Sequence, residues 1–578
     1  MSNRSVSEML VEGLVDHGVE QVFGVVGDAL NSFTDAIRRR DGIEWVGVRH
    51  EEVAAFAAGA QAQLTGRLGV CAGTVGPGSI HLLNGLYDAA KSHAPVLAIT
   101  GQVEVGLLGT NYFQEIDADA LFRDVSVFNH TIVSPSQMPV LAEQAIEAAL
   151  GQQGVAVLTL PGDIGTQSVP DDAKAVRAFN DPSRSRPADE HLAAAAALIN
   201  GGGKVTLLVG IGASGARAEV VELSKRLAAP MVVTLKGKET FDWDNPAQVG
   251  QSGLLGNPAA AAALDDCDVL VMVGTDFPYP EWYPEAKRTV QIDARAAHLG
   301  RRTPVEVGLV GDAALTLVAL LPMLRQVDRS DHLDGACAGY TAWCERQQEL
   351  TRPGHDDTLA GKARSALDNR SHRIRPEAVA AAIDRLADDD AIFTTDTGMS
   401  TVWLARFVSL RQHQRLLGSF NLGSMANAMP QAIGAQITFP GRQVIAFAGD
   451  GGFTMLLGDL LTAVALELPV KIVIFDNHRL GMVKLEQEEA GSPEYGTELA
   501  NPDLAAVATA MGATGIRIED PEELEAALAG ALAARGPVVV DVLTNPDEVA
   551  LPPSTGFSQA RGFAVAKIKE AIRSRGDT

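Results

Sequence analysis

Cysteine is scarce in this chain of 578 residues. The four cysteines, Cys71, Cys267, Cys337 and Cys344, form no CxxC pair and no cysteine–histidine spacing of a metal site. Four scattered thiols cannot supply a disulfide framework, and thiols stay reduced in the cytosol. We therefore expect free cysteines and a cytoplasmic protein.

The chain also lacks long apolar runs and an excess of basic residues. No run reaches the roughly 18 residues that a membrane span needs. The N-terminal stretch MSNRSVSEMLVEGL has no apolar core of a signal peptide. Lysine and arginine number 47 against 72 aspartates and glutamates, a net charge of −25. Because phosphate binding needs a basic surface, we expect no nucleic-acid partner.

What is present indicates a folded α/β protein of several domains. Polar stretches without periodicity at 180–190 and 351–376 are typical of linkers, and each of the three segments between them is of ordinary domain size. Short apolar runs alternate with helical spacing in every segment. The runs expected as buried strands are 20–27, 43–50, 68–76, 95–101, 204–210, 229–234, 268–274, 288–294, 391–396, 443–449, 469–477 and 536–544. This pattern predicts three doubly wound, parallel-sheet domains.

One turn in the third segment suggests chemistry. In VIAFAGDGGFTMLLGDL (444–460) an apolar strand runs into Asp450, which stands among Gly449, Gly451 and Gly452, and a helix is expected to follow over 454–468. Ligands of open parallel sheets bind beyond the carboxyl ends of strands, where glycines and a helix N-terminus favour phosphate. An aspartate there would repel phosphate unless a cation lay between them, so Asp450 suggests Mg²⁺. The other interpretation is an ordinary tight strand-to-helix turn.

A second oxygen ligand is expected from the neighbouring strand KIVIFDN. Its last residue, Asn477, follows Asp450 by 27 residues. This arrangement resembles the motif of thiamine diphosphate enzymes, in which GDG is followed by roughly thirty residues and then by two asparagines. Here Asp476 replaces the first asparagine and Asn477 is kept. The resemblance implies Mg²⁺ ligands from Asp450, Asn477 and the backbone carbonyl of Arg479.

Thiamine diphosphate also needs a carboxyl group that exchanges a proton with its aminopyrimidine ring. RHEEVAAFAAGA matches the family's catalytic glutamate, and we assign that role to Glu51 rather than Glu52; the alternative is a first-turn glutamate favoured by the helix dipole. The resemblance further implies that Met425 supports the bent coenzyme and that the carbonyl of Gly423 accepts from its amino group. Thr397 and Gly398 match a loop near its reactive end.

The middle segment suggests a second cofactor. KVTLLVG runs into GIGASG, a weak GxGxxG pattern, and no acidic residue follows at the spacing of a nicotinamide site. Further stretches, QSGLLGNP, VGTDFPYPEWYP, QIDARAAHLGRR and GLVGDAAL, resemble the FAD-binding stretches of the bacterial pyruvate oxidases. The residues implied to contact FAD are Gly210, Gly212, Leu254, Thr275, Asp276, Asp293 and Asp312. The alternative is that the fold persists without flavin.

Over nearly its whole length the chain resembles thiamine diphosphate- and FAD-dependent pyruvate dehydrogenases (quinone) and pyruvate oxidases. The resemblance implies a pyrimidine-binding domain (1–180), a central FAD-binding domain (190–345), a diphosphate- and Mg²⁺-binding domain (370–550) and a tail (551–578). Phe113 and Gln114 would flank the reacting carbon, with Glu486 near the intermediate. The implied reaction converts pyruvate, or a similar 2-oxo acid, to acetate and CO₂ through hydroxyethyl-thiamine diphosphate, while FAD passes electrons to a quinone.

Several alternatives remain open at this point. An acetolactate synthase-like ligase and an oxidase that uses O₂ and phosphate would share the motifs. A silent binding protein is the third alternative, and the joint presence of Glu51, Asp450 and Asn477 argues against it. Met482 stands where several relatives carry an aromatic residue near both cofactors. The family's site lies between subunits, which implies a homodimer or homotetramer. The tail segment GFAVAKIKEAIRSR could contact a membrane weakly or pack on its own protein.

Overall fold

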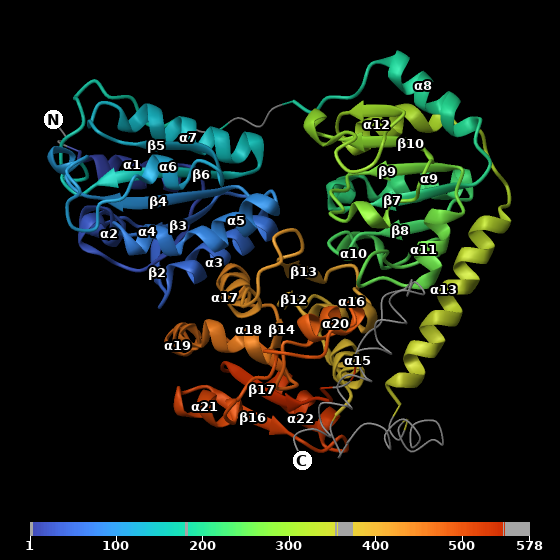
Figure 1. Ribbon diagram of the computed structural model, residues 1–578. Helices are drawn as coiled ribbons and strands as arrows, with labels where there is room; N and C mark the ends of the chain where they lie inside the picture. Colours follow the sequence, from blue (N-terminus) through green and yellow to red (C-terminus); the bar gives the residue numbers. More distant parts are fainter. Residues whose placement is uncertain are drawn as a thin grey trace.

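Three α/β domains make up the part of the chain that can be described. The computed structural model describes residues 4–546 except 178, 180–182, 353–354 and 356–373, together with Glu548. Each domain is built on one sheet, of six, five and six strands, and every strand pair within these sheets is parallel. The predicted fold class is confirmed. The first domain is blue in Figure 1, the middle domain green and the third orange to red.

The first domain has the strand order β2-β1-β3-β4-β6-β5. Its strands are β1 (Gln21–Gly24), β2 (Glu44–Gly47), β3 (Gly69–Gly73), β4 (Val96–Gln102), β5 (Ser126–Thr131) and β6 (Val155–Pro161). Its helices are α1 (Val6–Asp16), η1 (Asp28–Leu30), α2 (Asn31–Arg39), α3 (Glu51–Thr65), α4 (Pro77–His81), α5 (Leu83–Lys91), η2 (Val105–Leu107), α6 (Ala118–Leu121) and α7 (Met138–Gln152).

The middle domain has the order β11-β10-β9-β7-β8. Its strands are β7 (Val205–Val209), β8 (Met231–Val233), β9 (Val269–Val273), β10 (Arg288–Asp293) and β11 (Val307–Val310). Its helices are α8 (Asp189–Asn200), η3 (Ile211–Ala216), α9 (Arg217–Leu227), α10 (Lys238–Phe241), α11 (Pro258–Asp265), η4 (Pro280–Trp282), η5 (Ala296–His298), α12 (Ala313–Leu320), η6 (Leu321–Met323) and α13 (Asp331–Leu350), and α13 extends toward the third domain (Figure 1).

The third domain repeats the topology of the first, with the order β13-β12-β14-β15-β17-β16. Its strands are β12 (Ile392–Thr395), β13 (Arg415–Gly418), β14 (Val444–Gly449), β15 (Lys471–Asp476), β16 (Thr514–Ile518) and β17 (Val538–Leu543). Its helices are α15 (Pro376–Leu386), α16 (Met399–Phe407), α17 (Ala428–Thr438), α18 (Asp450–Met455), η8 (Leu457–Asp459), α19 (Leu460–Ala465), α20 (Gly481–Glu489), α21 (Leu504–Ala510) and α22 (Leu524–Ala533).

Two sequence-based boundaries were wrong. The strand expected to reach His50 ends at Gly47, because His50 instead caps the N-terminus of α3, where its side chain accepts from the Glu52 N–H. The helix expected over 454–468 is divided: α18 already begins at Asp450, and η8 separates it from α19. The predicted tail, residues 551–578, lies outside the described residues. Among the residues that the structure describes, no helix has the length and apolar content to cross a bilayer.

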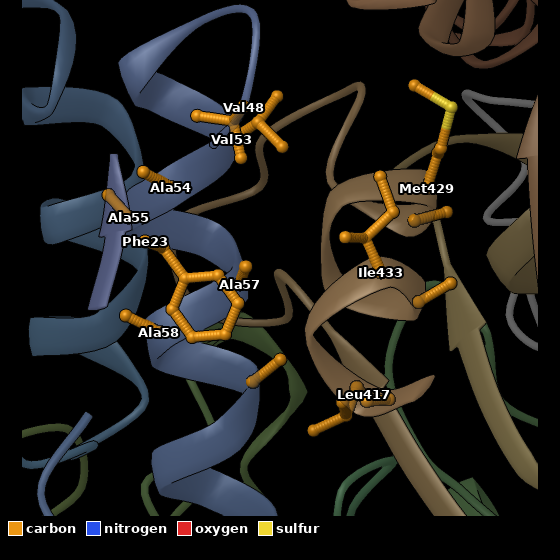
Figure 2. Close-up of a cluster of buried hydrophobic side chains, with 14 of the residues drawn as sticks. Phe23, Val48, Val53, Ala54, Ala55, Ala57, Ala58, Leu417, Met429 and Ile433 are labelled. Carbon is orange, nitrogen blue, oxygen red and sulfur yellow. The ribbon is translucent and has the colours of Figure 1, made fainter. Parts of the chain in front are cut away.

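The first and third domains dock through equivalent helices, α3 and α17. Each follows the second strand of its domain, and buried side chains of both helices share one core cluster. Figure 2 shows Ala57 on the side of α3 that faces Met429 and Ile433 of α17. At the closest approach, a Cβ on Gly434 would stand 2.5 Å from the carbonyl oxygen of Ala57. Small residues therefore set the distance between the two domains.

This contact predicts that any side chain at residue 434 will lower the stability of the protein. Gly434→Ala should lower the stability by about 1–3 kcal/mol, because the new methyl group meets backbone that cannot move aside. Thermal unfolding measures the effect. Gly530→Ala in α22 is the matched control, because a Cβ there meets nothing within 4 Å, and it should leave stability unchanged or raise it by about 0.4–1 kcal/mol. Equal melting temperatures for the two variants would contradict the docking.

Candidate active site

A pocket opens at the carboxyl edge of the third sheet. Asp396, Asp450, Asn477 and Thr544 line it, and each directly follows a different strand. The parallel sheet brings these strand ends together, as in other doubly wound folds. The remaining lining residues are Pro376, Thr397, Gly398, Met399, Ser400, Trp403, Met425, Gly449, Gly451, Gly452, Phe475, Arg479, Leu480, Gly481, Met482, Val483, Asn545 and Glu548. All of them belong to the third domain.

Asp450 is the most constrained carboxylate of this pocket. It is 2% exposed, and its Oδ1 accepts from the Gly451 N–H at 2.9 Å. Asn501 donates to its Oδ2 at 2.8 Å and to Oδ1 of Asp476 at 3.0 Å. Burial, and then the charge of Asp476, raise the pKa of Asp450 to about 7. A buried carboxylate pair of this kind suits a cation.

Asn477 completes the polar end of the pocket. Its Oδ1 accepts from the Arg479 N–H at 2.9 Å, which folds the chain after β15 into a tight turn. The Arg479 guanidinium bonds to Glu494, so its side chain turns toward another loop. The structure thus places all three predicted metal-binding residues, Asp450, Asn477 and Arg479, at one pocket.

The apolar part of the pocket lies beside this turn. A Cβ on Gly451 would stand 3.3 Å from Cε of Met425, so the methionine packs directly over the glycine turn. Thr397 and Gly398 lie just beyond the carboxyl end of β12, the strand beside β14. The φ of +142° at Gly398 favours glycine. Gly423, at φ +80°, is exposed and is not among the lining residues.

Glu51 lies at the carboxyl edge of the first sheet. It begins α3, is 7% exposed, and its Oε2 lies 2.9 Å from Nδ1 of His81. The neighbouring Glu52 instead accepts from Asn84 at 2.7 Å, and Asn84 also donates to Ser424 of the third domain. Glu51 is not among the residues that line the pocket of the third domain.

Of the remaining predicted catalytic residues, Phe113 and Glu486 are exposed and Gln114 is half-buried. Phe113 is 78% exposed, and Gln114 adopts φ +65°, a strained conformation that is frequent at functional sites. Their loop is held by Glu115, which accepts from the backbone N–H groups of Gly109 and Tyr112. Glu486 lies exposed on α20, the helix that carries Met482 and Val483.

Family comparisons agree with this geometry. The N-terminal TPP-binding domain of thiamine pyrophosphate enzymes matches residues 4–121, the central domain 192–320 and the C-terminal TPP-binding domain 396–542. The chain belongs to the thiamine pyrophosphate enzymes. Thiamine pyrophosphate, or thiamine diphosphate, is therefore its coenzyme, and Mg²⁺ is the ion typical of the family.

Relatives of this thiamine pyrophosphate enzyme have different names. The Bacillus subtilis protein YdaP, named as a thiamine pyrophosphate-containing protein, is 38% identical over 576 residues, 100% of this chain and 97% of its own. The pyruvate oxidase of Lactiplantibacillus plantarum is 32% identical over 539 residues, covering 92% and 87%. The acetolactate synthase large subunit of Parasynechococcus marenigrum is 33% identical over 554 residues, covering 92% and 86%.

The residues of the third domain fit Mg²⁺ and a diphosphate. Oδ2 of Asp476 is buried and has no hydrogen-bond partner among the described residues, which marks an uncompensated negative charge. A Cβ on Gly449 would meet nothing within 4 Å, so there is open space beside the glycine turn at the N-terminus of α18. Asp450, Asn477 and the Arg479 carbonyl would hold the ion.

The residues predicted to contact FAD gather at the carboxyl edge of the middle sheet. Gly210 and Gly212 follow β7, Asp293 ends β10 and Asp312 caps α12; Leu254, Thr275 and Asp276 lie in the loops after β8 and β9. Their present contacts are within the protein. Asp276 pairs with Arg302 at 3.0 Å, and a Cβ on Gly210 would stand 2.4 Å from the Gly274 carbonyl oxygen. The predicted FAD contacts therefore share one edge of the sheet, and the packing of the turn also requires the glycines.

Sequence reasoning missed three polar residues of the site. Asp396 is 2% exposed and accepts from the N–H groups of Ala428 and Gly449, which links the start of α17 to the glycine turn before Asp450. Its position at the end of β12 could have identified it. Asn501 and His81 reach the site from loops and helices remote in sequence, and no spacing pattern signals them.

The buried carboxyl groups of Asp396 and Asp450 predict how the stability of the metal-free protein depends on pH. Burial raises the pKa of Asp396 to about 7, and that of Asp450 is also about 7. The folded protein therefore binds more protons than the unfolded chain, so its stability should fall as pH rises from about 4 through about 7. Added Mg²⁺ should restore more stability at pH 8 than at pH 6, because it competes with a proton at Asp450. Melting temperatures with and without Mg²⁺ measure this.

Asp450→Asn should abolish most of the Mg²⁺-dependent stabilisation, whereas Asp389→Asn, at a side chain that is 90% exposed in the same domain, should retain it. Stabilisation by Mg²⁺ that is equal at both pH values and unaffected by Asp450→Asn would place the ion elsewhere.

Proposed function

We propose that this enzyme oxidatively decarboxylates pyruvate, or a similar 2-oxo acid, to acetate and CO₂, and that FAD passes the electrons to a quinone. The observation that carries this proposal is the contact between the middle domain and the thiamine pocket. Arg406 of α16 donates to the carbonyls of Leu255 and Gly256 at 3.3 and 3.4 Å. Leu255 packs on the same core as Met482, which lines the pocket.

This contact supports a short path between the two cofactors within one chain. Leu254, a predicted FAD contact, belongs to the loop that Arg406 holds, and α16 begins directly after Gly398 of the thiamine pocket. Burial lowers the pKa of Arg406 to about 10, so the side chain stays charged near neutral pH. A flavin at the edge of the middle sheet would therefore lie next to the pocket rather than across the molecule.

The protein's own residues have defined tasks in this reaction. Bound thiamine diphosphate supplies the carbon nucleophile and electron sink for decarboxylation, and FAD supplies the two-electron acceptor. Glu51 would hold the proton exchanged with the coenzyme, and Met425 would support it. Phe113 and Gln114 would flank the 2-oxo acid, and Glu486 would orient it.

The complete site requires a second copy of the chain, which we propose as a homodimer or a tetramer of such dimers. The pocket is lined by residues of the third domain, whereas Glu51 and Phe113 belong to the first. Large apolar side chains are exposed around both halves, as expected for surfaces that meet a partner. They are Val26, Ile80, Tyr112 and Phe113 in the first domain, and Met455, Val483 and Tyr495 in the third.

Flavin spectroscopy tests the oxidative reaction. Mixing the FAD-loaded enzyme with pyruvate without oxygen should bleach the flavin, and a quinone analogue should restore its colour with acetate as product. Glu51→Gln should slow bleaching by about 10²–10⁴-fold, since it removes proton transfer, while Glu52→Gln should not. Stable flavin colour with acetolactate as product would instead identify a carboligase. Acetyl phosphate and peroxide, formed with O₂ and phosphate, would identify an oxidase of that type.

Subunit mixing tests the shared site. Glu51→Gln and Asp450→Asn chains should each be inactive alone. Co-expressed, they should recover about one quarter of wild-type activity, because random pairing gives half mixed dimers, each with one intact site. A site built within one chain would give no recovery. Sedimentation of the wild-type chain as a monomer under assay conditions would also contradict the proposal.

A further inference from the structure

Two histidines surround the carboxylate of Glu51. Nδ1 of His81 lies 2.9 Å from Oε2 of Glu51. The rings of His50 and His81 stack with centroids 4.5 Å apart and an interplanar angle of 23°. Glu51 comes from the start of α3, and His81 ends α4 thirty residues later in the chain. The fold therefore places this imidazole pair beside the proposed proton-exchanging group.

Both oxygens of Glu51 have fixed surroundings. Since a carboxylate oxygen accepts, His81 donates through Nδ1–H to Oε2. The other oxygen, Oε1, faces Gly78, where a Cβ would stand 3.1 Å away. Gly78 and His81 are three residues apart on α4 and so lie on one face of it. This face of α4 holds one oxygen and leaves space at the other.

The ring of His81 packs against the ring of His50. Its Nδ1 accepts from the Glu52 N–H at 3.2 Å, so its ring is fixed by the cap of α3. The side chain of His81 is 44% exposed, whereas that of Glu51 is 9% exposed. Ligand atoms of the three residues lie within 4.8 Å of one another. The Nδ1 atoms of both rings, however, already have partners, in the Glu52 N–H for His50 and in Glu51 for His81.

We propose that His81 is a positioning residue for the proton transfer by Glu51. By donating to Oε2 and resting on His50, it selects one rotamer of Glu51 and presents Oε1 to the coenzyme. This inference rests on the proposed role of Glu51. It assigns His81 no contact with the substrate, so its loss should slow the ionisation of the coenzyme without weakening coenzyme binding.

The test is the exchange of the C2 proton of bound thiamine diphosphate into D₂O, quenched in acid and read by NMR, with Mg²⁺ present and no 2-oxo acid. His81→Asn keeps an N–H donor at the place of Nδ1, whereas His81→Gln places its amide where Nε2 stood. His81→Gln and His81→Ala should slow exchange by about 10–100-fold through misplacement of Glu51. His81→Asn should recover most of the rate. Coenzyme affinity should change little in all three.

The outcomes separate this inference from the proposed function. Wild-type exchange rates in His81→Gln, or equal rates in His81→Asn and His81→Gln, would overturn the positioning role. Glu51→Gln serves as the reference: if it exchanges as fast as wild type, the proton-exchanging role of Glu51 itself fails, whatever His81 does. Because Asn and Gln are both polar and close to histidine in size, their contrast does not depend on the alanine variant folding.

Discussion

The close packing of α3 against α17 is the constraint on which the rest of the structure depends. The two helices hold equivalent places in domains of identical strand order, and the Ala57–Gly434 contact fixes their separation. Glu51 opens α3, and Met425 precedes α17 by three residues. The contact between α3 and α17 therefore fixes the positions of Glu51 and Met425 within one chain. It also leaves the carboxyl edge of each sheet free to meet another molecule.

The middle domain is attached to this pair through β13. Arg415 donates to the carbonyls of Leu64 and Gln63 at the C-terminal end of α3, where the helix dipole favours a cation. The same guanidinium pairs with Glu239 of the middle domain at 3.3 Å, and Glu239 also accepts from the Leu416 N–H. One short strand thus contacts all three domains.

The sequence predicted what depends on local pattern. Central strands are buried on both faces, so their apolar runs were recognisable. The four strands β5, β11, β13 and β16 were missed; all are edge strands with exposed or polar positions, although the edge strands β2 and β8 were recognised. The buried strand β6 was also missed, although VAVLTLP carried the signal. Site residues at strand ends were predictable from motifs. Asn501 and His81 were not, because only the tertiary fold brings them to Asp450 and Glu51.

Asp476 shows how the chain departs from the family motif without losing the site. A neutral residue there would leave Asp450 as the main buried charge, whereas Asp476 adds a second carboxylate. Burial, and then the charge of Asp476, also raise the pKa of Asp541 to about 6. Arg517 offsets part of this charge by pairing with Asp541 at 2.7 Å, and Asn501 bridges the other two carboxylates. One arginine cannot neutralise three buried carboxylates. The remaining negative charge lies next to Asp450, so the substitution strengthens the demand for a cation in the place where the coenzyme needs one.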